Sequence, residues 1–203
     1  MKSLLKVDPR LQIVKMEEVL KEPKIIRVNK FNEESLEEFE EDLNDAQNTG
    51  QPVVPIILDS FGGGAYSLLG FIAAIEQVEK PVATILTSKA MSCGAILFSF
   101  GTDGYRFMHP DATLMIHDAA AGVFGKIKDI KNDTKHLSKM NKKVYRKMSK
   151  HLGHPSNYIL DLIKEHSHVD WFLSAKQAKK RNIANHLRIP HFEVEINLSV
   201  KFI

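Results

Sequence analysis

The chain has 203 residues, 43% of them hydrophobic and 26% charged, which is the composition of a globular domain large enough for a full core. Its formal net charge of +3 is too small to predict a nucleic-acid partner, and its single cysteine excludes an intrachain disulfide. The N-terminal residues lack the apolar core of a signal peptide, and no apolar run approaches the length of a membrane span. We therefore expect a cytoplasmic protein with no membrane partner.

The first part of the chain alternates apolar runs with an amphipathic segment. We expect an N-terminal arm over residues 1–23, followed by a short strand over 24–28. Asn32 is placed to cap an acidic helix whose apolar residues recur every three or four positions. A second strand is expected over 53–58. Pro55 indicates that this strand lies at an edge or pairs irregularly, because proline cannot donate to a strand ladder.

The middle of the chain continues the alternation of strands and helices. We expect helices over 66–78 and 91–100, and strands over 82–87, 105–108 and 112–117. Helices that separate successive strands are typical of an α/β fold with a largely parallel sheet.

The last third begins with a long amphipathic helix, expected over residues 126–152. It holds ten lysine and arginine residues but only two aspartates, and no series of aromatic residues that could stack on bases is interleaved with them. A solvated face is therefore favoured over a nucleic-acid site, and the length of the helix suits packing against a second subunit. The strict alternation of apolar and polar residues over 192–203 predicts a half-buried strand, so we assign 190–203 to a C-terminal strand extension.

Four short strings contain the residue types of a serine hydrolase. No single string would indicate this function, but the four occurring together in this order do. They are Ser60-Phe61-Gly62-Gly63-Gly64, Ala90-Met91-Ser92-Cys93-Gly94-Ala95, Leu114-Met115-Ile116-His117-Asp118, and His168-Val169-Asp170-Trp171-Phe172-Leu173-Ser174-Ala175. Together they supply a nucleophile, a base, an orienting acid and backbone donors for an oxyanion.

Each string predicts a particular role. Ser92 follows a strand and opens a helix, so its hydroxyl can be exposed while the N–H of Cys93 points into the same space, as at a nucleophile elbow. Gly63 can supply a second oxyanion donor, because a missing side chain lets a substrate approach closely. His117 is the expected base. Asp170 would orient its imidazole and stabilise the imidazolium.

Several other interpretations stay open. Taken alone, Ser92 is an ordinary residue at a helix start, and His117 is an ordinary core histidine. A Cys93–His117 pair would make a cysteine hydrolase, although Cys93 is better explained as a small core residue. The late histidines could suggest a metal site, but no cysteine or carboxylate stands at ligand spacing, so we expect no metal and no cofactor. These histidines are His151, His154, His166 and His168.

From about Lys24 to about Ile189 the chain resembles the proteolytic subunit of the Clp protease, a self-compartmentalised serine peptidase. The family's Ser-Pro-Gly-Gly turn matches residues 60–63, and its Ala-Ser-Met-Gly-Ala string matches residues 91–95. Its Met-Ile-His-Gln string matches 115–118, and its Arg-Asp-x-Phe-x-Ser-Ala string matches 169–175. The glycines at 122 and 125, followed by Asp129-Ile130, match the family's substrate-channel segment and the start of its handle helix.

The resemblance implies a role for each matched residue. The catalytic triad would be Ser92, His117 and Asp170, and the oxyanion donors would be the amides of Gly63 and Cys93. The residues implied in substrate binding are Gly62, Gly64, Gly122 and Gly125.

The resemblance also implies an architecture and partners. The fold would be a spiral of ββα units, shared with crotonase-like proteins, with a protruding handle helix and a peptidase domain over residues 24–189. Such subunits form heptameric rings that stack, and AAA+ unfoldases feed them unfolded polypeptides, which are hydrolysed through an acyl-enzyme. The alternatives are a non-proteolytic scaffold paralogue and a crotonase-like acyl-thioester enzyme.

Some positions depart from the family pattern. Phe61 replaces the turn proline, and Gly64 replaces a serine. Trp171 stands where an arginine normally pairs one ring with the other. We expect its indole to pack against apolar handle residues such as Val144 or Met148 instead, which predicts ring stacking that is less sensitive to salt than an ion pair would be.

Overall fold

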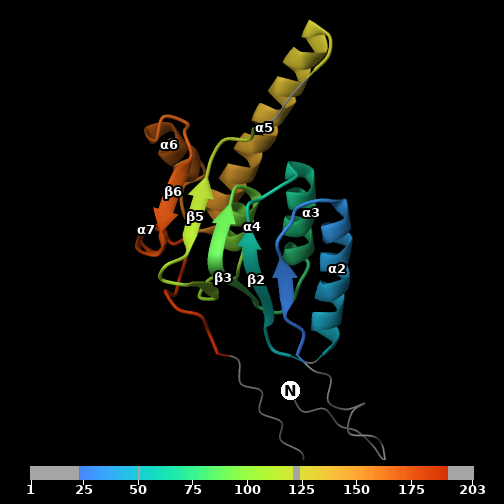
Figure 1. Ribbon diagram of the computed structural model, residues 1–203, viewed down its shortest axis with the longest axis vertical. Coiled ribbons are helices and arrows are strands. Elements are labelled where there is room, and N and C mark those ends of the chain that lie inside the picture. Colours follow the sequence, from blue (N-terminus) through green and yellow to red (C-terminus); the bar gives the residue numbers. More distant parts are fainter. Residues whose placement is uncertain (1–22, 50, 121–123, 192–203) are drawn as a thin grey trace, which may run out of the picture.

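The computed structural model describes residues 23–49, 51–120 and 124–191. The N-terminal arm up to residue 22, Gly122 and the C-terminal strand expected over 192–203 lie outside these ranges. The described residues form one six-stranded sheet and six helices (Figure 1). The α/β class expected from the sequence, with its protruding helix, is confirmed.

The elements follow one another in a regular order. They are β1 (Ile26–Val28), α2 (Glu33–Asn48), β2 (Val54–Ser60), α3 (Ala65–Glu76), β3 (Val82–Met91), α4 (Cys93–Ser99), β4 (Arg106–Met108), β5 (Thr113–Ile116), α5 (Ile127–His151), α6 (Tyr158–Glu165), β6 (Trp171–Ser174) and α7 (Ala175–Lys180).

The strands are ordered β1-β2-β3-β5-β6, and β4 also pairs with β3. All neighbours are parallel except β5 and β6, which are antiparallel. The first part of β3 pairs with β4 over Thr84–Leu86, and its last part pairs with β5 over Lys89–Met91. The C-terminal end of β3 therefore lies directly beside the C-terminal end of β5.

This pairing corrects the boundary expected between strand and helix. The sequence predicted that the strand ends at Thr87 and that the next helix starts at Met91, but the strand runs to Met91 and the helix starts at Cys93. Polar residues at 87–89 end the apolar run, whereas the ladder to β5 keeps the backbone extended. Tertiary pairing thus overrides the local pattern.

Of the two alternatives that Pro55 left open, an edge strand or an irregular pairing, the edge strand is wrong. Strand β2 lies between β1 and β3. The pairing of β2 with β1 begins only at Ile56. At Pro55, β2 is therefore paired on one side only, with Ala83 of β3. The missing N–H is therefore accommodated at the end of the shorter ladder.

Helices α2 and α3 lie side by side next to β1 and β2 (Figure 1). As predicted, Asn32 caps α2: its side chain accepts the Ser35 N–H at 2.8 Å, while Ser35 Oγ accepts the Asn32 N–H at 3.0 Å. Below this cap, Phe39 of α2 and Phe71 of α3 pack with ring centroids 4.6 Å apart. These contacts fix the helical layer against the sheet.

Helix α5 extends beyond the rest of the described fold (Figure 1). Its buried residues all lie in the second half, beginning at Met140, and include Val144 and Met148. Ile127, at the other end of the predicted apolar stripe, is 73% exposed. No helix in the described part of the chain is long and apolar enough to cross a membrane.

Trp171, whose indole was expected to pack against handle residues such as Val144 or Met148, is buried among other residues of its own chain. The indole is only 4% exposed, stacks on His166 with centroids 4.7 Å apart, and has the Arg181 guanidinium 5.2 Å from its ring centre. Alternation along β6 turns Trp171 inward and Phe172 outward. Trp171 is thus enclosed by residues of its own chain, which leaves little of the indole exposed for the contact expected between rings.

Candidate active site

Ser92 lies at the turn between β3 and α4. Its φ of 54° and ψ of −120° place a non-glycine residue in a region that L-residues rarely occupy. Its N–H donates to Met115 O of β5 at 2.8 Å, which ties the turn to the neighbouring strand. Strain at a serine between strand and helix is the feature that exposes the nucleophile in an elbow.

His117 follows β5 directly and contacts this serine. Because β3 and β5 are parallel neighbours, their carboxyl ends meet at one edge of the sheet. His117 Nε2 lies 2.8 Å from Ser92 Oγ, a hydrogen-bond distance. When Nε2 of a neutral imidazole accepts the serine proton, Nδ1 carries the other proton and faces a different partner.

Asp170 lies on that other side of His117. It directly precedes β6. In the antiparallel ladder Trp171 of β6 is opposite Ile116 of β5, so Asp170 and His117, the next residue on each strand, are brought together. Asp170 Oδ1 is 3.6 Å from His117 Nδ1, within ion-pair range but longer than a hydrogen bond. The carboxylate side chain is 56% exposed.

The glycine turn after β2 lies directly against the serine. Gly62 has φ +102°, and a Cβ built on it would lie 2.8 Å from Ser92 Cβ and 2.9 Å from Met91 O. Gly63 has φ +157°, and a Cβ there would lie 2.6 Å from Phe31 O. Only glycine combines these backbone angles with so close an approach.

The amides around the serine have different partners. The Gly62 N–H donates to Ser60 Oγ at 3.1 Å, and the Gly64 N–H donates to Phe31 O at 2.7 Å. Cys93 is the first residue of α4, so its N–H is among those that a helix leaves without an intrahelical acceptor. Gly125, before α5, has open space around its α-carbon.

The Cys93 side chain points to the glycine turn. Its Sγ donates to Gly63 O at 3.3 Å. Burial raises the pKa of the Cys93 thiol above its ordinary value. The thiol therefore stays protonated at neutral pH and joins the turn to α4.

Contacts that the sequence did not predict surround His117. From α5, Tyr145 Oη donates to the His117 carbonyl, and Asn141 Nδ2 donates to Asp118 Oδ1 at 2.7 Å. Burial raises the pKa of Tyr145, so its phenol keeps the proton that it donates. Asp118 Oδ2 lies 2.5 Å from His168 Nδ1. The four-residue spacing of Asn141 and Tyr145 was the only sequence signal for these contacts.

The late histidines have other partners than a metal. His151 contacts Gly101 O, His154 contacts Arg181 O, and His166 contacts Leu162 O. No group of three potential metal ligands occurs among residues 23–49, 51–120 and 124–191.

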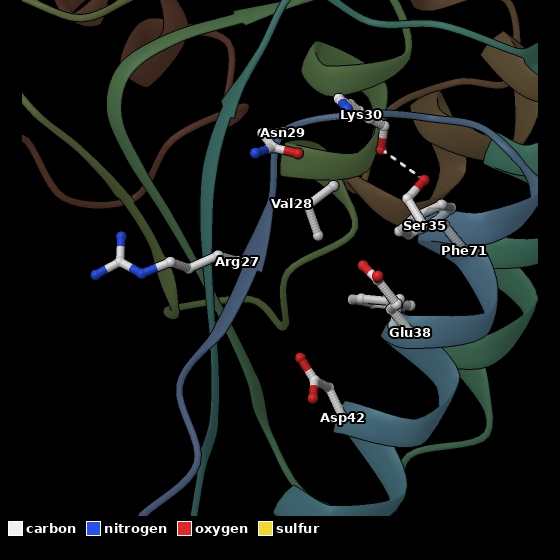
Figure 2. Close-up of a pocket in the computed structure, with 9 residues that line it drawn as sticks. Arg27, Val28, Asn29, Lys30, Ser35, Glu38, Asp42 and Phe71 are labelled. Atoms are coloured by element: carbon white, nitrogen blue, oxygen red, sulfur yellow. Dashed lines mark hydrogen bonds between the residues drawn. The ribbon is translucent and has the colours of Figure 1, made fainter.

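A small cavity of about 40 Å³ lies between β1 and α2 and is separate from these residues. Figure 2 shows Glu38 and Asp42 of α2 lining it, while the Arg27 side chain of β1 points away from them. Ser35 Oγ donates to Lys30 O at 3.2 Å at its rim. A space of this size holds a few water molecules at most.

The contact between a strained serine and a histidine at the carboxyl edge of an α/β sheet is the arrangement of the serine hydrolases. The sequence profile described as Clp protease matches residues 10–188, and the chain belongs to this family. The match begins earlier than the resemblance near Lys24 suggested, and it includes part of the expected N-terminal arm.

The chain is similar to the ATP-dependent Clp protease proteolytic subunit 1 of Salinibacter ruber (strain DSM 13855 / M31). The two are 30% identical over 141 residues, which cover 70% of this chain and 58% of that relative. The chain thus matches little more than half the length of this curated relative.

Proposed function

We propose that this chain is a serine endopeptidase of the Clp type, which hydrolyses peptide bonds of unfolded proteins or peptides through an acyl-enzyme on Ser92. The proposal depends above all on the 2.8 Å contact between His117 Nε2 and Ser92 Oγ. Membership of the Clp protease family supports the choice of peptide bonds as substrate.

In the proposed reaction, Ser92 Oγ attacks the carbonyl carbon of the scissile bond while His117 Nε2 accepts the hydroxyl proton. The Asp170 carboxylate stabilises the resulting imidazolium, and its 3.6 Å separation shortens as charge develops. His117 then gives the proton to the leaving amine. Water then attacks the acyl carbon while His117 accepts its proton, and His117 returns that proton to Ser92 Oγ as the acyl–oxygen bond breaks and the second product leaves.

The developing oxyanion would be bound by the backbone amides of Cys93 and Gly63. The first lies at the N-terminal end of α4, where the helix dipole also favours negative charge. The second lies in the turn that the Cys93 thiol holds in place. Removal of one such donor typically costs about 10²–10³ in kcat.

The geometry favours a serine nucleophile over the cysteine alternative. The Cys93 thiol donates to Gly63 O, whereas His117 contacts the serine. The same Ser–His contact favours an enzyme over a scaffold, and it has no role in a crotonase-like reaction.

The wider assembly is part of the same proposal. We infer that the chain works in the cytoplasm as a homo-oligomer, a heptameric ring that stacks in pairs through α5. An AAA+ unfoldase would supply extended polypeptide. In such an assembly, exposed side chains near the start of α5, such as Ile127, would be covered by a second copy.

A fluorophosphonate probe tests the proposal on the full-length protein. We expect the probe to label the wild type at Ser92, and Ser92→Ala to lose labelling and to lower turnover of short peptides by several orders of magnitude. Ser88→Ala is the matched control, because it changes an exposed serine on β3, four residues before Ser92. Near-normal turnover by Ser92→Ala together with loss in Cys93→Ser would refute the serine assignment.

A further inference from the structure

Asp118, the residue after His117, connects three separate parts of the chain. Its Oδ2 lies 2.5 Å from Nδ1 of His168, two residues before Asp170. Its Oδ1 accepts a hydrogen bond of 2.7 Å from Asn141 Nδ2 of α5. Both carboxylate oxygens are therefore engaged, one by the segment that carries Asp170 and the other by the long helix.

The side chain of Asn141 strengthens the link to α5. Its Oδ1 accepts the N–H of Ala119 at 3.1 Å, so one asparagine holds both the side chain of Asp118 and the backbone of the next residue. The adjacent turn of the helix supplies Tyr145, which donates to the His117 carbonyl. The segment 117–119 is thus attached to α5 by three hydrogen bonds.

The segment that presents His168 has an unusual backbone. Ser167 and His168 have φ of 56° and 59°, two consecutive non-glycine residues with positive φ. Their amides donate to Lys164 O and Ile163 O, which end helix α6. At the end of this backbone turn, the His168 imidazole contacts Asp118.

Asp170 itself is weakly held. Its carboxylate is more than half exposed, and in the described part of the chain no hydrogen bond to it fixes its position. The 3.6 Å separation from His117 Nδ1 therefore depends on how the segments before β6 and after β5 are joined.

We propose that Asp118 is a positioning residue, which through His168 and Asn141 sets the separation of His117 and Asp170. This inference rests on the proposed function, in which that separation governs proton transfer. Asp118 does not reach the reacting atoms: it joins the two segments that carry them. The 59% exposure of His168 means that the pair contributes geometry more than stability.

The test compares His168→Ala with His168→Gln, which keeps an N–H donor, and with Asp118→Ala. The expected result for both alanine variants is a kcat on a fluorogenic peptide lower by about tenfold, with KM within about twofold, because misplacing catalytic groups by about 1 Å can cost up to about 10²-fold in rate. His168→Gln should recover most of kcat. His109→Ala is the control, since His109 faces Asp111 in an exposed pair before β5, at the opposite end of that strand from His117.

A rate unchanged in His168→Ala, a change in KM alone, or an equal loss in His168→Gln would overturn the inference. Nuclear magnetic resonance of the His117 ring gives a readout that needs no turnover: His168→Ala should shift its imidazole signals and His109→Ala should not. Absence of fluorophosphonate labelling in the wild type would count against the proposed function, whereas unmoved His117 signals would count against the role of Asp118.

Discussion

In the proposed site, the backbone and the side chain of Cys93 have separate roles. Its N–H is at the start of α4, directly after Ser92, and its thiol donates to Gly63 O. The sequence predicted the backbone role from the position after Ser92, but it could not predict the thiol contact, because that contact depends on how the glycine turn packs. The same is true of Asp118 and His168, which lie 50 positions apart and pair only in the folded chain.

The raised pKa of Cys93 predicts slow alkylation at neutral pH. The thiolate is the reactive form, and a raised pKa means that the thiolate forms only above the ordinary thiol range of about 8.5. The same preference for the protonated thiol means that folding stability declines as pH rises through that range. We expect iodoacetamide to react at pH 7.5 more than about tenfold slower than with a free thiol.

The matching variant is Cys93→Ala, which should keep peptide turnover within about tenfold of the wild type, because the oxyanion donor belongs to the backbone. Mass spectrometry of the alkylated protein measures the rate. Rapid alkylation at neutral pH, combined with loss of turnover in Cys93→Ala, would show that the thiol takes part in the chemistry.

At the scale of elements, the turn after β2 and the start of α4 form one unit. Gly62 approaches Ser92 Cβ so closely that no side chain fits. The sequence predicted the glycine turn and the serine separately. Their direct contact follows from the register of β2 and β3, in which Ser60 is opposite Ala90, and that register includes an irregularity between Leu58 and Ser60 that no local pattern revealed.

Gly62→Ala should therefore abolish activity and destabilise the fold. The positive φ alone costs roughly 1–2 kcal/mol for a residue with a Cβ, and the clash with Ser92 adds to this. Gly104→Ala is the matched control, because Gly104 also has a positive φ, +83°, but has open space around it. Urea denaturation and fluorophosphonate labelling measure the two effects.

We expect Gly104→Ala to lose only the stability that its backbone angle accounts for and to keep full labelling of Ser92. The same loss of stability and the same labelling in both variants would show that a Cβ at Gly62 does not clash with Ser92.

At the scale of the molecule, the class of fold and the order of the site residues could be predicted from local patterns, because strands and helices alternate and the four strings fall at strand ends. The arrangement of the C-terminal part could not. Buried Arg106 donates to the carbonyls of Gly101, Ile183 and Asn182 and so ties the segment after α7 to β4. Trp171 is buried for a similar reason, since Arg181 and His166 enclose it.

Because Trp171 is buried, the prediction about assembly is based on the charge and the exposed apolar residue of α5. This helix carries nine lysine and arginine residues against two aspartates, so two such helices brought together repel each other. Its apolar Ile127 is exposed and would be covered by a partner helix. Because salt screens charges beyond a Debye length of about 10 Å at 0.1 M, we expect stacking of rings to increase as ionic strength rises.

Light scattering of the full-length protein across an ionic-strength series measures this. The expected result is a homo-oligomer at all salt concentrations, with the stacked species favoured at high salt and weakened by Ile127→Asp, which puts a charge on the contact. A monomer throughout would refute the homo-oligomer. Rings that separate as salt rises would show that ion pairs stabilise the stack. In that case the basic residues of α5 would pair with acidic residues of the partner ring instead of repelling it.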